Sequence, residues 1–373
     1  MKITNIEIKN FKGFEDFTTD IHDKFTLLIG NNGTGKTTIL DALAVGLNDL
    51  LSGFPEQKSP YSIRINQEQI RRVNYDQENG INTTTEQQYP VSVTCIGNVN
   101  GIEMQWKQAI NGEGKTPIID KQIELFSKQL YEKSKNENVI LPLVAYYGTD
   151  RLWRKTENLS QNSISETRTQ GYLNCLHPDS NLKSLIKWLE EKEKDVIINK
   201  KSSAALEVVK NAISECMENW QTITYDLQKA EVLAIALDGT ALPLTMLSDG
   251  IRNMLAMVAD IAYRAVILNP HLDKNAAKQT PGIVLIDEID LHLHPKWQRR
   301  VVEDLYRTFP NIQFVATTHS PFIIQSLRIG KLVNLVDIDQ EVEYYSQSIE
   351  DITENVMDVE LPQQSKRFLE KMA

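Results

Sequence analysis

Short apolar runs alternate with segments of helical spacing along the first part of the chain. Residues 3–8 alternate between apolar and polar side chains, typical of a half-buried strand, and residues 25–29 form a continuous apolar run, typical of a buried one. A Lys-Gly turn at 12–13 lies between them, so we expect an antiparallel β start. Apolar residues then recur at helical spacing from 38 to 51, which predicts a helix after the second strand.

The rest of the pattern also mixes strands with helices. Residues 52–90 are polar and predict an irregular excursion with a short helix at 67–73. Turn residues at 97–101 and 238–239 separate apolar runs, which predicts two β-hairpins. The further elements expected are helices over 119–131, most of 182–228, 250–268, 295–309 and 351–373, and strands over 91–96, 102–106, 141–147, 225–237, 242–247, 283–286 and 313–316. This mixture predicts an α/β protein.

Composition sets limits on the class of protein. With 41% hydrophobic and 24% charged residues among 373, the chain has the make-up of a globular protein. No apolar run reaches the roughly 18 residues that span a bilayer, and no signal-peptide pattern is present, so we expect a cytoplasmic protein without membrane contact. The scattered Cys95, Cys175 and Cys216 fit reduced thiols in that compartment. A net charge of −10 disfavours a uniformly basic DNA-coating surface but leaves a local basic groove open.

The first chemical motif follows the apolar run at 25–29. Residues 30–37 fit the phosphate-loop (Walker A) pattern G-x-x-x-x-G-K-[ST] and open a predicted helix, where glycines let backbone N–H groups point at phosphates. We expect Lys36 to reach the β- and γ-phosphates, Thr37 to bind Mg²⁺ and Thr38 to hold the α-phosphate. The expected nucleotide-binding residues are Gly30, Asn31, Asn32, Gly33, Thr34, Gly35, Lys36, Thr37 and Thr38.

A second motif has the Walker B form. The apolar run at 283–286 ends in Asp287 and Glu288. Asp287 is expected to bind Mg²⁺, directly or through water. Glu288 is expected to orient and polarise the attacking water as the catalytic base. Together with the phosphate loop, the two acids predict an enzyme that converts ATP and water to ADP and phosphate.

The segment Leu-Ser-Asp-Gly at 247–250 opens a predicted helix, and a Ser hydroxyl, a Gly N–H and a helix N-terminus together suit an anion. It resembles the signature motif of ABC ATPases, which caps the γ-phosphate bound by the opposite subunit. The resemblance implies that Ser248 and Gly250 contact nucleotide held by a second copy. Asp249 and Arg252 depart from the transporter form of the motif, which points to the RecF, Rad50 and SMC-like branch.

Three more positions take roles from the same resemblance. Within Thr-Thr-His-Ser-Pro, His319 corresponds to the switch histidine that contacts the γ-phosphate and is expected to be catalytic. Asp290 opens an Asp-x-His-x-His-Pro segment similar to the dimer-contacting loop of RecF and OLD-like chains, so its histidines are not favoured as metal ligands. Lys12 matches the basic residue beside the nucleotide in Rad50-like chains. Gln88 as the Q-loop residue and Arg151 as a phosphate contact stay open.

Three motifs together most resemble the PtuA ATPases of Septu antiphage systems and of retrons with the same module. They are Asp-Glu-Ile-Asp-Leu-His-Leu-His-Pro, Thr-Thr-His-Ser-Pro and Leu-Pro-Leu-Val-Ala-Tyr-Tyr-Gly-Thr-Asp-Arg-Leu-Trp. The resemblance implies ATP and Mg²⁺ as cofactors and a head-to-tail homodimer or higher even oligomer. It also implies a PtuB-like HNH nuclease partner acting on nucleic acid, together with the reverse transcriptase and non-coding RNA where a retron is involved.

Two alternatives stay open beside the defence ATPase. One is the ATPase part of an OLD-like nuclease, for which Asp337 and Asp339 are more simply strand-end acids. The other is a RecF-like DNA repair ATPase. The apolar stripe of the last predicted helix could contact a partner or the chain's own core. Because this helix stops abruptly, a longer natural chain is also an open alternative.

The fold expected is an α/β ABC ATPase head, a P-loop NTPase with a mixed parallel sheet core, an N-terminal antiparallel β subdomain and an inserted helical subdomain. We place the N-terminal β subdomain with Walker A at 1–110 and the mainly helical insertion at 111–240. The half with the signature, Walker B and switch histidine follows at 241–345, and a partner- or oligomer-contacting helix at 346–373.

Overall fold

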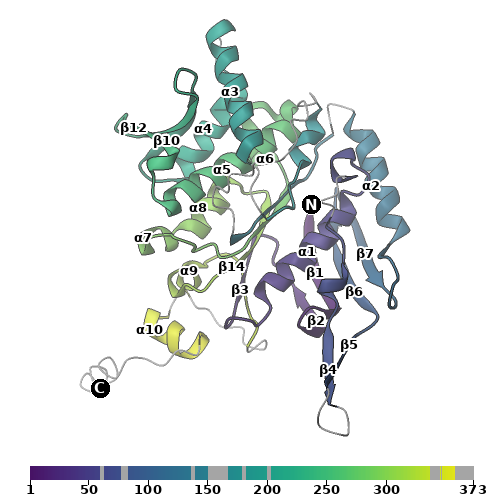
Figure 1. Cartoon of the computed structure of the whole chain (residues 1–373). Coiled ribbons are helices and arrows are strands. Elements are labelled where there is room, and N and C mark those ends of the chain that lie inside the picture. The colour runs from purple at the N-terminus through teal and green to yellow at the C-terminus, as the bar shows by residue number, and fades with distance from the viewer. Residues whose placement is uncertain are drawn as a thin grey trace, which may run out of the picture.

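The computed structural model describes residues 1–58, 63–76, 83–135, 139–149, 167–178, 182–199, 203–336, 345 and 347–357 (Figure 1). A parallel sheet forms the centre of this part of the chain, with strand order β15-β3-β14-β13-β9. The strands are β3 (Phe25–Ile29), β9 (Leu143–Tyr147), β13 (Gly282–Ile286), β14 (Ile312–Thr317) and β15 (Lys331–Asn334). All residues of β3, β9, β13 and β14 are buried, which explains their nearly continuous apolar runs.

A second, antiparallel sheet has the order β2-β1-β6-β7-β8. Its strands are β1 (Lys2–Phe11), β2 (Phe14–Asp20), β6 (Val91–Val99), β7 (Ile102–Ile110) and β8 (Ile118–Ile119). The expected pairing of the first strand with residues 25–29 was wrong, because β2 pairs with β1 and β3 lies in the parallel sheet. The physical reason is that β3 has no polar face to leave in solvent, whereas β2 alternates between buried and exposed residues.

The helix after the phosphate loop, α1 (Lys36–Leu50), contacts both sheets. It is buried on almost every side, as expected for a helix between two sheets. Its Gly46 carbonyl accepts a hydrogen bond from Trp106 Nε1 of β7 at 2.8 Å. A Cβ at Gly46 would lie 2.3 Å from Cys95 Sγ, so the close packing of α1 on the antiparallel sheet needs glycine here. Helix α2 (Lys121–Ser134) packs against α1.

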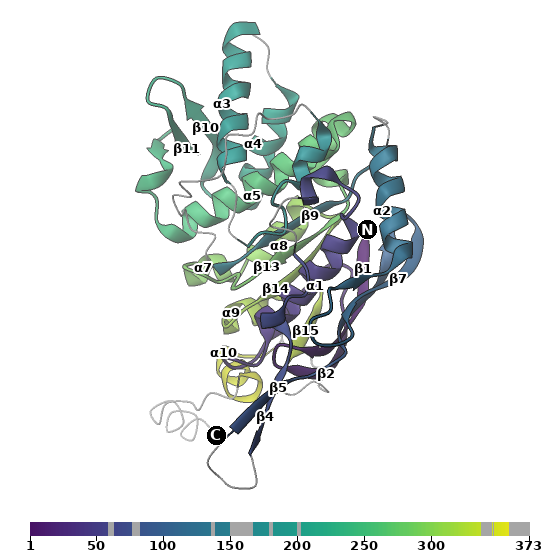
Figure 2. The same cartoon turned by 45° about the vertical axis from the view of Figure 1, so that its right-hand side comes forward.

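A lobe of helices and a small sheet lies on the other side of the central sheet (Figure 2). It contains α3 (Leu182–Asn199), α4 (Ala204–Cys216), α5 (Asp249–Leu268) and the antiparallel strands β10 (Trp220–Asp226), β11 (Glu231–Ala236) and β12 (Ala241–Pro243). The expected single strand over 225–237, and helix up to 228, were wrong. The Asp226 carboxylate accepts hydrogen bonds from the N–H groups of Gln228 and Lys229, and Ala230 has φ 54°, so the chain turns there and forms a hairpin.

Three smaller expectations also differ from the structure. The helix expected over 67–73 was wrong, because this stretch holds the short 3₁₀ turn Gln67–Gln69 and the start of β4 (Arg72–Asp76). Strand β4 forms a projecting hairpin with β5 (Thr83–Gln87) (Figure 1). The helix expected over 295–309 is divided into α7 (Pro295–Gln298) and α8 (Val301–Thr308), where Arg300 has the non-helical φ of −130°. The expected C-terminal helix is present as α10 (Ile349–Asp351) and a π-helical turn, Ile352–Val356; the rest of it lies outside the described residues.

The predicted α/β fold with an N-terminal antiparallel subdomain is confirmed by these two sheets and their helices. The remaining short helices are Pro55–Lys58, Arg168–Tyr172, Leu244–Met246, Pro270–Asn275, α6 (Ala276–Gln279) and α9 (Pro321–Ser326). Among the described helices, none combines the length and the apolar character needed to cross a bilayer.

Candidate nucleotide-binding site

Three predicted loops meet at one edge of the central sheet. The phosphate loop follows β3, the switch-histidine loop follows β14 and the two Walker B acids follow β13. In the strand order, β14 lies between β3 and β13, and all three strands run parallel. Since carboxyl ends of parallel strands share one edge of a sheet, the loops come together where doubly wound folds bind ligands.

The phosphate loop depends on glycines with backbone angles that other residues rarely adopt. Gly30, Gly33 and Gly35 have φ of 147°, 84° and 101°. A Cβ at Gly35 would lie 2.5 Å from the Phe14 ring of β2, so both conformation and space require glycine at this position. Asn31, Asn32 and Gly33 are exposed, so this part of the loop is open to a ligand from solvent.

Lys36 begins α1 and its ammonium lies inside the loop. Its Nζ donates to the carbonyl oxygens of Gly30 and Asn31, at 2.8 and 2.9 Å. Burial lowers the pKa of Lys36, and the carboxylates of Asp287, Glu288 and Asp290 act in the opposite direction. The ammonium is thus held in the loop by two neutral carbonyl oxygens, and the negatively charged oxygens of a phosphate would be stronger partners.

The two predicted metal ligands are brought together. Thr37 Oγ1 donates to Asp287 Oδ2 at 2.9 Å, and the other oxygen of the buried Asp287 accepts from Thr317 Oγ1 at 2.6 Å. A hydroxyl on the phosphate loop beside a Walker B carboxylate is the arrangement that holds Mg²⁺ in P-loop NTPases. These oxygens therefore fit a magnesium ion bound next to the phosphates.

Glu288 has a strained backbone and lies beside the metal ligands. Its φ of 47° is in the left-handed region, which is uncommon for a residue with a side chain. Its N–H donates to Thr317 Oγ1 at 2.7 Å, which fixes the start of the loop against β14. Such strain occurs at sites where the surrounding structure must aim a side chain.

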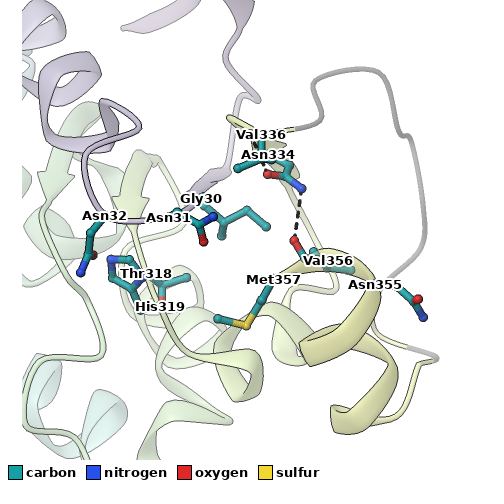
Figure 3. Close-up of a pocket in the computed structure, with 11 residues that line it drawn as sticks. Gly30, Asn31, Asn32, Thr318, His319, Asn334, Val336, Asn355, Val356 and Met357 are labelled. Atoms are coloured by element: carbon teal, nitrogen blue, oxygen red, sulfur yellow. Dashed lines mark hydrogen bonds between the residues drawn. The ribbon is translucent and has the colours of Figure 1, made fainter. Parts of the chain in front are cut away.

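Asp290 links the Walker B loop to the switch-histidine loop within one chain. Its Oδ1 accepts from Thr318 Oγ1 at 2.6 Å and from the His319 N–H at 3.3 Å. The half-buried His319 ring lies near Asn32 of the phosphate loop (Figure 3). The role of Asp290 across a subunit contact stays a prediction, and the bonds to the histidine loop were not expected from the sequence.

The C-terminal segment forms a wall that sequence reasoning missed. A cavity of about 370 Å³ is lined by Gly30, Asn31, Asn32, Thr318 and His319 on one side and by Asn334, Val336, Asn355, Val356 and Met357 on the other (Figure 3). Asn334 Nδ2 donates to the Val356 carbonyl at 3.2 Å, and Ile352 packs against Ile29 and Ile324. The apolar stripe of the predicted last helix was the available signal, but it did not reveal which residues it covers.

The signature residues lie on the N-terminus of α5 and are not part of that cavity. Ser248 is exposed and forms no side-chain capping bond, while the neighbouring Asp249 pairs with Arg252. Gly250 is buried, and a Cβ there would lie 2.2 Å from the His292 carbonyl oxygen. Glycine thus lets the start of α5 pack on the loop after Walker B, while the nearby Ser248 stays exposed.

The other predicted residues have ordinary local partners or lie outside the described chain. Lys12 has φ 50° and its ammonium pairs with Asp41 of α1 at 2.5 Å, which places it beside the phosphate-loop helix. His294 accepts from the Lys296 N–H and so caps α7. Gln88 donates to the Glu86 carbonyl near the β4–β5 hairpin. Arg151, Asp337 and Asp339 are outside the described residues.

Comparison with known proteins agrees with this geometry. A family model described as an AAA domain matches residues 5–221, and a second AAA domain model, whose description names the AbiEii toxin of a type IV TA system, matches residues 131–325. The chain is 30% identical to the Retron Ec83 probable ATPase of Escherichia coli, over 88% of this chain and 70% of that protein. The chain belongs to this family of AAA-domain ATPases.

Two further relatives and one solved structure are also similar to this chain. The Retron Vc95 probable ATPase of Vibrio cholerae is 26% identical, over 96% of this chain and 78% of the relative. Septu protein PtuA of Bacillus mycoides is 26% identical over 93% of this chain, but this covers only 42% of PtuA. An Smc head bound to the C-terminal winged helix domain of ScpA has a TM-score of 0.54 at 16% identity, covering 90% of this chain and 94% of that one, which supports the fold alone.

Proposed function

We propose that this ATPase binds Mg²⁺–ATP between two copies arranged head to tail and hydrolyses it there. The observation that carries the proposal is the separation of its motifs. Walker A, Walker B and the switch histidine share one sheet edge, while the exposed Ser248 lies at the N-terminus of a different helix. A second copy would supply Ser248 and Gly250 to the open side of the phosphate site.

Each site residue then has a defined task. Lys36 and the loop N–H groups bind phosphate oxygens, and Thr37 and Asp287 hold Mg²⁺. Glu288 orients the attacking water, and His319 contacts the γ-phosphate from the adjacent loop. Lys12 neutralises phosphate charge next to α1. Asp290 keeps the histidine loop in place, because it already accepts bonds from Thr318 and His319.

The biological role we infer is control of a partner HNH nuclease in antiphage defence in the cytoplasm. The named relatives from retron and Septu systems support this role. The C-terminal segment supports it as well, since residues 355–357 share a cavity with the phosphate loop and His319, and could transmit the nucleotide state to a bound protein. A retron reverse transcriptase and its RNA would join the complex where the chain acts in a retron.

The test is Glu288→Gln, which keeps the size of the side chain but removes the base. We expect turnover to fall by about 10²–10⁴-fold, as is typical when a positioned base is lost, with ATP binding retained. Size-exclusion chromatography with light scattering should show a dimer or larger even oligomer in Mg-ATP. Unchanged turnover would contradict the role of Glu288, and a monomer indifferent to ATP would contradict the shared site.

The partner is tested by mass spectrometry of proteins that co-purify with the tagged chain from its own host. A small nuclease present in stoichiometric amount supports the defence role. Salt-dependent DNA affinity of the chain alone, without such a nuclease, would instead favour a RecF-like role.

A further inference from the structure

Beside the phosphate-binding edge, a buried side-chain network joins α5 to the end of β9. The Tyr147 hydroxyl donates to Asp260 Oδ2 at 2.7 Å, and Arg264 Nε donates to the same oxygen at 2.8 Å. Arg264 Nη1 also donates to the Gly171 carbonyl at 2.7 Å. The exposed fractions of Tyr147, Asp260 and Arg264 are 2%, 1% and 4%, so the whole network is removed from water.

Stability alone is a poor explanation for this network. Burying two opposite charges costs much of what their attraction returns, and apolar side chains of similar volume often serve as well. Because a carboxylate only accepts hydrogen bonds, the Tyr147 hydroxyl is the donor to Asp260 in this network. The residues to which the network is linked at either end suggest a role for the Tyr147–Asp260 bond.

One end of the network reaches the Walker B acid. Tyr147 is the last residue of β9, and its carbonyl oxygen accepts the Asp287 N–H at 2.8 Å. The strands β9 and β13 are parallel neighbours, with Tyr147 paired to Ile286. Tyr147 is thus bonded through its backbone to the predicted magnesium ligand and through its side chain to α5.

The other end reaches the signature motif through the helix. Asp260 lies on α5, whose N-cap is Ser248, so at 1.5 Å per residue the two are about 18 Å apart along a rigid axis. The same helix touches the loop after Walker B at its beginning, where Gly250 packs on the His292 carbonyl. Helix α5 thus contacts the loop after Walker B at its beginning, and further along it runs beside β9, whose last residue bonds to Asp287 (Figure 2).

We propose that Tyr147 is a positioning residue whose hydroxyl, held by Asp260, sets Asp287 in register with the signature helix. This inference rests on the proposed function. In the shared-site arrangement, Ser248 of a chain acts on the partner's nucleotide while Asp287 of the same chain acts on its own. The Tyr147–Asp260 bond therefore couples the two nucleotide sites of a dimer, so that closing one site aligns the metal ligand of the other.

The test is Tyr147→Phe in the full chain, which removes only the hydroxyl. We expect the turnover number for Mg-ATP to fall about tenfold, the effect of losing one net hydrogen bond to a charged group, while the Kd for ATP changes less than about twofold. The matched control is Tyr172→Phe. Tyr172 is equally buried, but its hydroxyl donates to the Pro142 carbonyl at 2.7 Å and not to the acid on α5.

The expected pattern is a similar loss of thermal stability in both variants and a loss of turnover only in Tyr147→Phe. Equal turnover loss in both variants, unchanged turnover in Tyr147→Phe, or a parallel loss of ATP binding in that variant would overturn the positioning role. The nucleotide site is tested separately by Lys36→Ala and Glu288→Gln. If those two behave as expected and Tyr147→Phe matches the unmodified chain, only the positioning role fails.

Discussion

The phosphate-binding edge of the central sheet and the N-terminus of α5 differ in how fully their polar groups are bonded. At the edge, Lys36, Asp287 and Thr317 hold one another or the loop backbone in place. At the start of α5, Ser248 is exposed and its hydroxyl caps nothing. One chain therefore carries a preformed half-site for nucleotide and, on another helix, a donor group suited to a different molecule.

The strongest way to break the preformed half-site is Lys36→Ala. We expect ATP binding to weaken by at least about 100-fold, because charge-assisted bonds to phosphate are worth about 1.5–3 kcal/mol each. Isothermal titration calorimetry with Mg-ATP measures the loss. Lys9→Ala, which removes an exposed lysine from β1, is the control and should bind as the unmodified chain does. Similar Kd values for the two variants would contradict the phosphate-loop assignment.

The exposed N-terminus of α5 is tested by Ser248→Arg, which places a bulky side chain there but leaves the phosphate-binding edge of the sheet intact. We expect ATP binding within about threefold and turnover reduced by 10-fold or more, roughly the cost of one lost transition-state donor. A 1:1 mixture with Lys36→Ala should regain up to about a quarter of the activity, because half of randomly formed two-fold dimers then carry one complete site.

The control for this experiment is Ser214→Arg, at an exposed serine of α4 in the same lobe, which should leave turnover unchanged. Absence of any recovery in the mixture, with both variants folded, would mean that Ser248 acts within its own chain.

A further prediction concerns the stability of the protein and not its nucleotide chemistry, and lies at the far end of α1. Asp49 is fully buried and accepts from Gln108 Nε2 at 2.6 Å, and burial raises its pKa to about 7. The folded state therefore binds a proton more tightly than the unfolded state. This stabilisation is complete below about pH 4 and is lost as pH rises through about 7, a change of at most about 4 kcal/mol.

Asp49→Asn should remove this part of the pH dependence without altering ATP binding. Urea unfolding at several pH values between 4 and 8 measures it, and Asp16→Asn, at an exposed carboxyl of β2, is the control. Identical pH profiles for Asp49→Asn and the control would show that the Asp49 carboxyl is not responsible.

The elements of the site were predictable where their chemistry is local. The phosphate loop can be predicted from its glycine spacing, and the Walker B strand from its apolar run and the two acids that follow it. The bounds of β3, β13, β14, α1 and α5 lie within two residues of those predicted. The hairpin at Asp226 was missed because its turn is made by one carboxylate bonding to nearby N–H groups, which hydrophobic periodicity does not report. The nucleotide roles of the site residues stay predictions.

The α/β class, the loops that contain Lys36 and Asp287, and the family of the chain all follow from the order of its amino acids, because each depends on short segments whose spacing can be read directly. The order of the strands in each sheet does not follow from such segments. Neither do the bond of Asp290 to the histidine loop, the position of Val356 in the cavity beside the phosphate loop, and the bond between Tyr147 and Asp260. These contacts join residues far apart in the chain. They arise because burying the apolar faces of β3, α1 and α5 leaves few arrangements of the sheets, and no local pattern records which arrangement is reached.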